Sequence, residues 1–99
     1  MAVPTYNLVR KNELAVLEFS IPTGVIETSE LPAAVEQAPH VDGNLAVCLN
    51  GRGPVWLFSA LTHKYHYTRA VSTYEPRLGA CVVTASHDPK YKVGDLIRI

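Results

Sequence analysis

The segment Gly51–Gly79, GRGPVWLFSALTHKYHYTRAVSTYEPRLG, decides the fold of this chain. It opens with an arginine between two glycines and continues with apolar residues at helical spacing, which predicts a helix from about Pro54 to about Tyr67. Two β-rich runs, 70–74 and 80–85, then flank a turn rich in proline and glycine, so a hairpin is predicted there. The helical side chains expected to face inward are Trp56, Leu57, Ala60 and Leu61.

The flanking sequence adds strands and a shorter helix to this segment. The continuous apolar run 45–49 is typical of a strand covered on both faces. Residues 5–10 and 14–21 predict a first hairpin, and residues 30–37 predict a short helix capped by Thr28 or Ser29. A last short strand is expected at 96–99. The pattern predicts one α/β domain over residues 1–99, with a mixed sheet of about six strands and two helices.

The charge of the chain is neutral overall but unevenly divided. The formal net charge at pH 7 is zero. Residues 1–50 hold two basic and six acidic side chains, whereas residues 51–99 hold seven basic and three acidic ones. The second half therefore predicts a basic face, which suits a small anionic ligand better than a long duplex. The alternative is ordinary solvated charge in both halves.

The two cysteines and the hydropathy pattern indicate where such a protein would work. Cys48 and Cys81 each lie in an apolar, strand-like run, so reduced core thiols are favoured over a disulfide. No apolar run is long enough to span a bilayer, and no signal-peptide pattern opens the chain. A cytoplasmic protein without a membrane partner is expected.

A candidate ligand site lies at the start of the predicted helix, in the turn Asn50-Gly51-Arg52-Gly53-Pro54. Unpaired backbone N–H groups and a partial positive charge at a helix start attract phosphate. Glycines allow a ligand to approach the backbone, and arginine adds a planar fork of donors. The turn is shorter than a nucleotide P-loop and lacks its lysine. The alternative is a tight turn with an exposed arginine.

Several titratable side chains follow this turn. His63 and His66 are three residues apart, so on a helix they share a face, where they could bind a metal or supply an acid and a base. His87 is a candidate third group. Glu75 and Arg77 flank Pro76 and are expected to project from one turn, where arginine would stabilise charge on a phosphate. Solvated histidines and a weak surface ion pair are the alternatives.

The aromatic residues allow two interpretations. Trp56, Tyr65, Tyr67 and Tyr74 could stack on adenine, but Trp56 lies at a core-facing position and most of the tyrosines would serve equally well in packing.

Taken together, the blocks GRGP (51–54), HKYH (63–66) and PRLG (76–79) resemble a small family attached to type III CRISPR systems. This family is the third class of CRISPR ring nucleases, first described as a manganese-dependent RNA deadenylase. The resemblance implies a minimal CRISPR-associated Rossmann-like fold, related to ferredoxin-like folds, and a two-fold homodimer. Such a dimer matches a cyclic tetra-adenylate ligand, because a symmetric ring meets the same surface twice. The family hydrolyses this messenger to linear di-adenylate, which switches off the effector nucleases.

The resemblance also implies roles for particular residues. The catalytic residues would be His66, Glu75 and Arg77. The ligand would contact Asn50, Gly51, Arg52, Gly53, Pro54 and His63. If Mn²⁺ takes part, its ligands would be His66, Glu75 and His87. Two positions depart from the family pattern: Glu75 replaces the usual aspartate, and Tyr67 replaces the second histidine of the HKYHH ending.

Three functions remain open at this point. The first is cleavage of cyclic tetra-adenylate, either by attack of a ribose 2′-hydroxyl or by a water activated on Mn²⁺. The second is a manganese-dependent deadenylase acting on linear RNA 3′ ends. The third is a non-catalytic sensor dimer for cyclic oligo-adenylate. In the family the ligand can be sandwiched between two dimers, so a tetramer or stacked dimers are expected alongside the homodimer.

Overall fold

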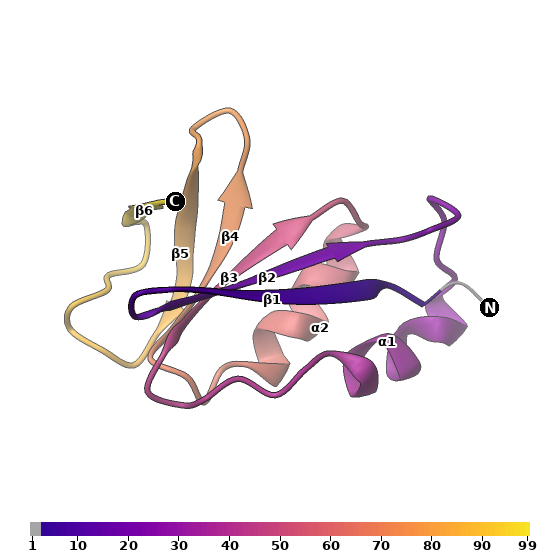
Figure 1. Ribbon diagram of the computed structural model, residues 1–99, viewed down its shortest axis with the longest axis horizontal. Coiled ribbons are helices and arrows are strands. Elements are labelled where there is room, and N and C mark those ends of the chain that lie inside the picture. Colours follow the sequence, from indigo (N-terminus) through magenta and orange to yellow (C-terminus); the bar gives the residue numbers. More distant parts are fainter. Residues whose placement is uncertain (1–2) are drawn as a thin grey trace.

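The computed structural model describes residues 3–99 and shows one mixed sheet of six strands with two α-helices (Figure 1). The strands lie in the sheet in chain order: β1 Thr5–Lys11, β2 Leu14–Ser20, β3 Ala46–Gly51, β4 Ala70–Glu75, β5 Ala80–Ser86 and β6 Leu96–Arg98. A 3₁₀ turn, η1 (Thr28–Glu30), leads into α1 (Leu31–Gln37), and α2 spans Val55–Lys64. The predicted α/β class, strand number and helix number are confirmed.

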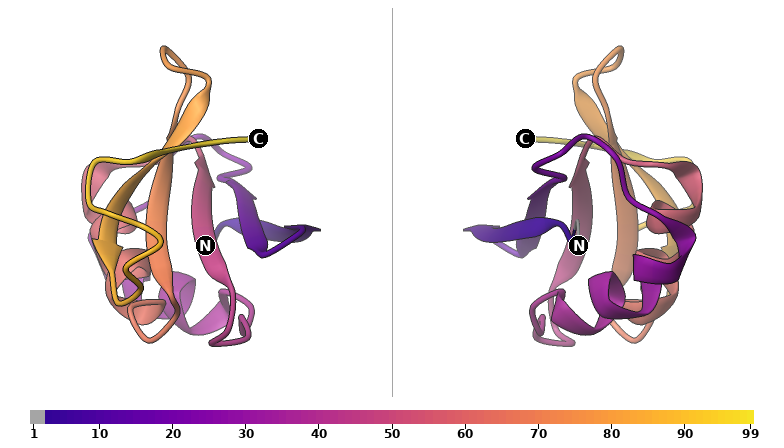
Figure 2. Two further views of the ribbon diagram at one scale, coloured as in Figure 1. Left: turned by 90° about the vertical axis from the view of Figure 1, so that its left-hand side faces the viewer. Right: turned by 90° about the vertical axis from the view of Figure 1, so that its right-hand side faces the viewer.

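The centre of the sheet is parallel and its margins are antiparallel. β2 pairs with β3 and β3 with β4 in parallel, so these three strands end at the same edge of the sheet. The two predicted hairpins, β1–β2 and β4–β5, supply the antiparallel pairs on either side, and β6 extends the sheet beyond β5. The sheet is strongly twisted, and the β4–β5 hairpin rises above the rest of the molecule (Figure 2).

Alternation along the central strands builds a core on each face of the sheet. On one face, β2, β3 and β4 contribute side chains such as Leu17 and Leu49, which pack against α1 and α2. On the other face, Val16 and Cys48 pack with β5, and Tyr91 and the β6 residue Ile97 lie against them. Residues 46–49 are completely buried, which confirms the prediction of a strand covered on both faces.

Element ends differ from the predictions by one to three residues. Pro54 is the N-cap of α2 rather than its first helical residue, and the helix ends at Lys64 instead of Tyr67. At the first helix, a 3₁₀ turn precedes α1, and the side chain of Glu30 accepts a hydrogen bond from Glu27 N at 2.8 Å. Neither Thr28 nor Ser29 caps α1, because that position is taken by Glu30.

The expectation of reduced core thiols is wrong. Cys48 on β3 and Cys81 on β5 form a disulfide, and their Cα atoms are 6.1 Å apart. Both side chains belong to the same buried cluster on the face opposite the helices. The bond links two strands that are not neighbours in the sheet, since β4 lies between them. The twist of the sheet therefore brings together two cysteines that the sequence places 33 residues apart.

The two glycines around Arg52 are required by packing against Phe19. A Cβ atom on Gly51 would lie 2.4 Å from the backbone oxygen of Phe19 and 2.8 Å from its ring. A Cβ on Gly53 would lie 3.1 Å from Leu57 and 3.3 Å from the Phe19 ring. The backbone of this turn thus lies directly on the core. A side chain at position 51 would force the backbone to move, whereas one at position 53 would be tight.

We predict that Gly51→Ala destabilises the fold by about 1–3 kcal/mol, because the new methyl group would have to displace the paired β2 backbone. Gly43→Ala is the matched control, since a Cβ there would meet only the Tyr67 ring, at an ordinary 3.6 Å. Urea unfolding of both variants measures the difference. Equal stability of the two variants would contradict the packing described here.

Candidate functional site

A large pocket lies at the edge where the parallel strands end. Its volume is about 1150 Å³ and it is formed by the ends of β2 and β3, the loop 20–26 and the start of α2. Tyr74 and Pro76, from the end of β4 and the turn that follows it, complete the wall. The predicted contact residues Asn50, Gly51, Arg52, Gly53 and Pro54 all line this pocket. These five residues form the floor of the cavity, and their contact with a ligand stays a prediction.

Arg52 supplies a free positive charge in the pocket. It is exposed, and within residues 3–99 its guanidinium makes neither a hydrogen bond nor an ion pair. The N-cap of α2, Pro54, provides no side-chain hydrogen bond to the helix start. An unpaired arginine beside the open start of a helix is a favourable environment for a phosphate group.

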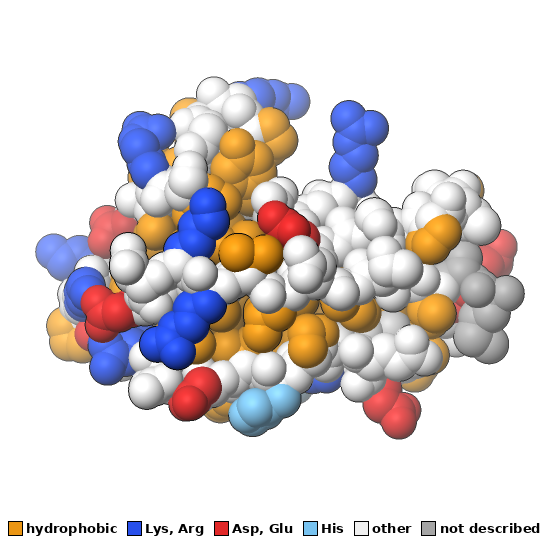
Figure 3. Space-filling model, viewed as in Figure 1, with side chains coloured by type: hydrophobic (Ala, Val, Ile, Leu, Met, Phe, Trp, Pro, Cys, Tyr) orange, Lys and Arg blue, Asp and Glu red, His pale blue; other side chains and the backbone are white. Residues whose placement is uncertain are grey.

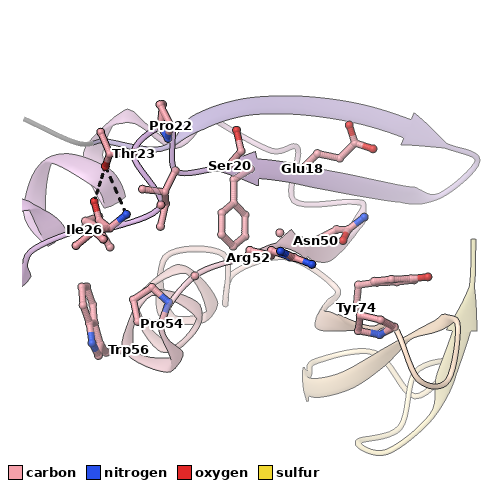
Figure 4. Close-up of a pocket in the computed structure, with 17 residues that line it drawn as sticks. Glu18, Ser20, Pro22, Thr23, Ile26, Asn50, Arg52, Pro54, Trp56 and Tyr74 are labelled. Atoms are coloured by element: carbon pink, nitrogen blue, oxygen red, sulfur yellow. Dashed lines mark hydrogen bonds between the residues drawn. The ribbon is translucent and has the colours of Figure 1, made fainter.

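The remaining walls of the pocket were not predicted from the sequence. One wall consists of Phe19, at the end of β2, and the loop 21–26 that follows it. This wall faces the glycine turn because Phe19 and Gly51 are partners in the β2–β3 register. Trp56 is partly buried against the core, as its spacing predicted, but it also lines the pocket. In Figure 4, Trp56 and Ile26 lie on one side of Arg52 and Tyr74 lies on the other.

All four histidines of the chain lie away from this pocket, where α2 and β5 end and in the loop before β3. The rings of His66 and His87 approach to 5.0 Å between centroids in an edge-to-face arrangement. The ring of His63 stacks on that of His66 at 6.2 Å. His40 stacks on Tyr67 at 6.2 Å. The structure thus unites His66 with His87, as expected, but separates His63 from the pocket residues with which it had been grouped.

In the segment HKYHY (63–67), the residues other than histidine anchor the chain that leads into β3. Lys64 Nζ donates to Ala38 O at 2.7 Å and also to Val35 O, so it caps the end of α1. The buried Tyr65 donates its hydroxyl to Pro39 O at 2.6 Å, and Tyr67 donates to Val41 O. Burial raises the pKa of Tyr65, which keeps this hydroxyl protonated as a donor. Anchoring side chains and exposed histidines are therefore interspersed along residues 63–67.

Tyr6 makes a similar anchor from β1. Its hydroxyl donates to Ala34 O at 2.7 Å, within α1, and burial raises the pKa of Tyr6 to about 12. Helix α1 is thus tied to β1 by Tyr6 and to the end of α2 by Lys64, which fixes the layer of helices against the sheet.

Glu75 and Arg77 lie at the β4–β5 turn, at the far end of β4 from the histidines. Glu75 Oε2 accepts a hydrogen bond from Arg77 N at 3.0 Å, which holds the turn together. Within residues 3–99 the guanidinium of Arg77 forms no ion pair. The first residue of β4, Ala70, pairs with Ser86 next to His87, whereas its last residue, Glu75, pairs with Ala80.

One chain therefore does not assemble the predicted catalytic set. The six residues of β4 span about 17 Å, at roughly 3.3 Å per residue, and this length separates His66 and His87 from Glu75 and Arg77. The predicted manganese ligands His66, Glu75 and His87 are divided in the same way. In the described part of the chain, no three metal-binding side chains converge. A single chain offers two neighbouring imidazoles, which is not a complete manganese site.

The end of the sheet where His66 and His87 lie, here called the histidine end, also carries an ionic cluster that was not predicted from the sequence. Lys90 Nζ lies 2.6 Å from Glu13 Oε2, and Arg69 lies 3.6 Å from Glu13 and 3.4 Å from Asp88. The hydrogen bond from Lys90 lowers the pKa of Glu13. Because Arg69 shares two carboxylates, its charge is less available to a ligand than that of Arg52.

The fold is an α/β domain with a pocket at the carboxyl ends of its parallel strands. A glycine-flanked arginine and the start of a helix line this pocket. This is the usual position of nucleotide and phosphate sites in such sheets. The family model described as CRISPR-associated protein (Cas_csx3) matches residues 20–98. The chain therefore belongs to this CRISPR-associated family.

One relative adds to this assignment. An uncharacterized protein of Aquifex aeolicus (strain VF5) is 49% identical to this chain over 55 residues. The matched stretch covers 56% of this chain and 50% of the relative, so it spans about half the length of that protein. Across residues 3–99, none of the helices has the length and apolar character needed to cross a membrane.

We predict that Lys64→Met lowers the stability of the fold by about 1 kcal/mol, because the carbonyl groups at the end of α1 would lose their donor. Lys92→Met is the control, as Lys92 is exposed and no side-chain contact of its ammonium group is found among residues 3–99. Thermal unfolding followed by circular dichroism compares the two. A Lys92 variant as unstable as the Lys64 variant would argue against the capping role.

Proposed function

We propose that this protein binds cyclic tetra-adenylate and, in an assembly of at least two copies, cleaves it to linear di-adenylate. Membership of the CRISPR-associated family carries the proposal. The pocket supports it, because a free arginine, a helix start and a volume of about 1150 Å³ suit a nucleotide with its phosphate. Clearing the messenger would switch off the nucleases that it activates.

The histidine end supports a metal-free route for the chemistry. The 2′-hydroxyl of one adenosine attacks the adjacent phosphorus, and the bond from phosphorus to the 5′ oxygen of the next nucleotide breaks. Of the neighbouring imidazoles of His66 and His87, one can take the 2′-hydroxyl proton and the other can give a proton to the leaving 5′ oxygen. The product then carries a 2′,3′-cyclic phosphate.

Arg77 and Glu75 complete this proposal from a second copy of the chain. The unpaired guanidinium of Arg77 would stabilise the charge that develops on the phosphorane. Glu75 would hold the turn through its hydrogen bond to Arg77 N, with a methylene more than the usual aspartate. Because β4 separates this turn from His66 within one chain, the groups can meet at a phosphate only across an interface between copies.

A second candidate function follows from the same separation. If copies do not assemble with the turn of one facing the histidines of another, the pocket alone would make the protein a sensor that binds cyclic oligo-adenylate and releases no product. A manganese-dependent deadenylase of linear RNA would need the same composite site, with an open groove for an RNA 3′ end.

The test is incubation of the pure protein with cyclic tetra-adenylate, with and without EDTA and Mn²⁺, and with linear oligo-adenylate in parallel. We expect di-adenylate with a 2′,3′-cyclic phosphate in the presence of EDTA. His66→Ala should lower the rate by about 10²–10⁴-fold while ring binding persists. His40→Ala, which removes an exposed histidine whose ring stacks on Tyr67, should retain activity.

Three results would contradict this account. Stoichiometric binding without product after long incubation with Mn²⁺ would favour the sensor. Much faster turnover of linear oligo-adenylate than of the ring would favour the deadenylase. Loss of all product on chelation would point to a metal-activated water instead of the 2′-hydroxyl.

A further inference from the structure

The pocket is larger than a phosphate requires, and its two parts differ in character. The floor at Arg52 and the glycine turn is polar and can hold a phosphate. To one side, the wall consists of apolar side chains, namely Ile21, Pro22, Val25, Ile26 and Trp56. We call these five residues the apolar alcove. Figure 4 shows Ile26 and Trp56 together at this end of the pocket, with Pro54 between Trp56 and Arg52.

The alcove is formed by the first turn of α2 and by the loop that follows β2. Trp56 belongs to the first turn of α2 and packs against the main core cluster, and Ile26 is 8% exposed within that cluster. The loop opposite is closed by local bonds: Gly24 N donates to Ile21 O at 2.8 Å, and Thr23 Oγ1 donates to Val25 O at 2.9 Å. These bonds close the loop, and its apolar side chains line the cavity.

The charge of the pocket limits what can occupy it. Among the residues that line it, Arg52 is the only cation and Glu18 the only anion. Glu18 accepts a hydrogen bond from Asn7 at 3.1 Å and lies at the rim, away from the alcove (Figure 4). One free arginine suits a single phosphodiester better than a polyphosphate. The alcove beside it suits a flat group with apolar faces.

We propose that the apolar alcove is the base subsite of this pocket, with Trp56 stacking on one adenine while the phosphate of the same nucleotide lies on Arg52. This inference rests on the proposed function and assigns Trp56 a role beyond core packing. An indole ring offers a large flat surface on which a base can stack, and stacking needs no hydrogen-bond donors or acceptors on the wall. The site then holds a nucleotide by its base and its phosphate at once.

Trp56 is the only tryptophan in the chain, so its fluorescence reports on the alcove directly. Wild-type protein is titrated with cyclic tetra-adenylate, with AMP and with ribose 5-phosphate, which lacks a base. Binding is measured in parallel by calorimetry. We expect the fluorescence to change with the two adenine ligands, at the same concentrations at which the calorimetric signal saturates, and not with ribose 5-phosphate.

Two variants separate stacking from packing. Trp56→Phe keeps an aromatic ring, and Trp56→Leu keeps only apolar bulk. The leucine variant should bind the ring about tenfold or more weakly, and the phenylalanine variant should stay within about threefold of wild type. Circular dichroism checks that both variants fold, and the wild-type titration stands even if one does not.

The outcomes distinguish this inference from the function on which it rests. Calorimetric binding of the ring without a fluorescence change, or a leucine variant that binds as tightly as wild type, would overturn the base subsite and leave ring binding in place. Equal binding of ribose 5-phosphate and AMP would also overturn it. Absence of any ring binding would overturn the proposed function and the subsite with it.

Discussion

Strand β4 sets the distance between the two pairs of candidate catalytic residues. It runs parallel to β3 in the middle of the sheet, and it is fixed there by β5 on its other side. At its start lie the imidazoles of His66 and His87, and at its end lie Glu75 and Arg77. A paired strand cannot shorten, so no side-chain rearrangement within one chain closes this distance. If these residues act together, as proposed, they can meet at one phosphate only across an interface between copies.

The same parallel arrangement creates the pocket. Because β2, β3 and β4 end at one edge, Phe19, the glycine turn and Tyr74 face a common space at the start of α2. The close contact between Gly51 and Phe19 keeps the turn tight against the core. The pocket and the neighbouring imidazoles of His66 and His87 therefore lie at opposite ends of the central strands. Figure 3 shows most of the Lys and Arg side chains of this face on the side where β5 and β6 lie, with a few Asp and Glu side chains among them.

Much of the fold and part of the site could be predicted from the sequence. Continuous or alternating apolar runs marked the strands, and the proline and glycine residues marked both the hairpin turn and the start of α2. The turn around Arg52 could be predicted as a candidate site because its residues are contiguous. The separation of His66 from Glu75 could also have been predicted, because a whole predicted strand lies between them. The family resemblance instead placed both residues in one catalytic set.

Other features depend on long-range geometry that the sequence does not contain. The bond between Cys48 and Cys81 depends on the twist that carries β3 toward β5 across an intervening strand. The pocket walls depend on the register that sets Phe19 opposite Gly51. The use of Lys64, Tyr65 and Tyr67 as anchors depends on where α1 ends. Tyr67, which departs from the family pattern, anchors the chain before β3 through its hydroxyl.

Mixing two inactive variants tests the composite site most directly. His66→Ala lacks the proton-transferring imidazole and Arg77→Ala lacks the guanidinium, so each assembly alone should fail to cleave cyclic tetra-adenylate. After the two proteins are unfolded, mixed and refolded together, some interfaces would pair an intact histidine end with an intact turn. The account predicts that cleavage returns in the mixture, and a mixture as inactive as its components would contradict it.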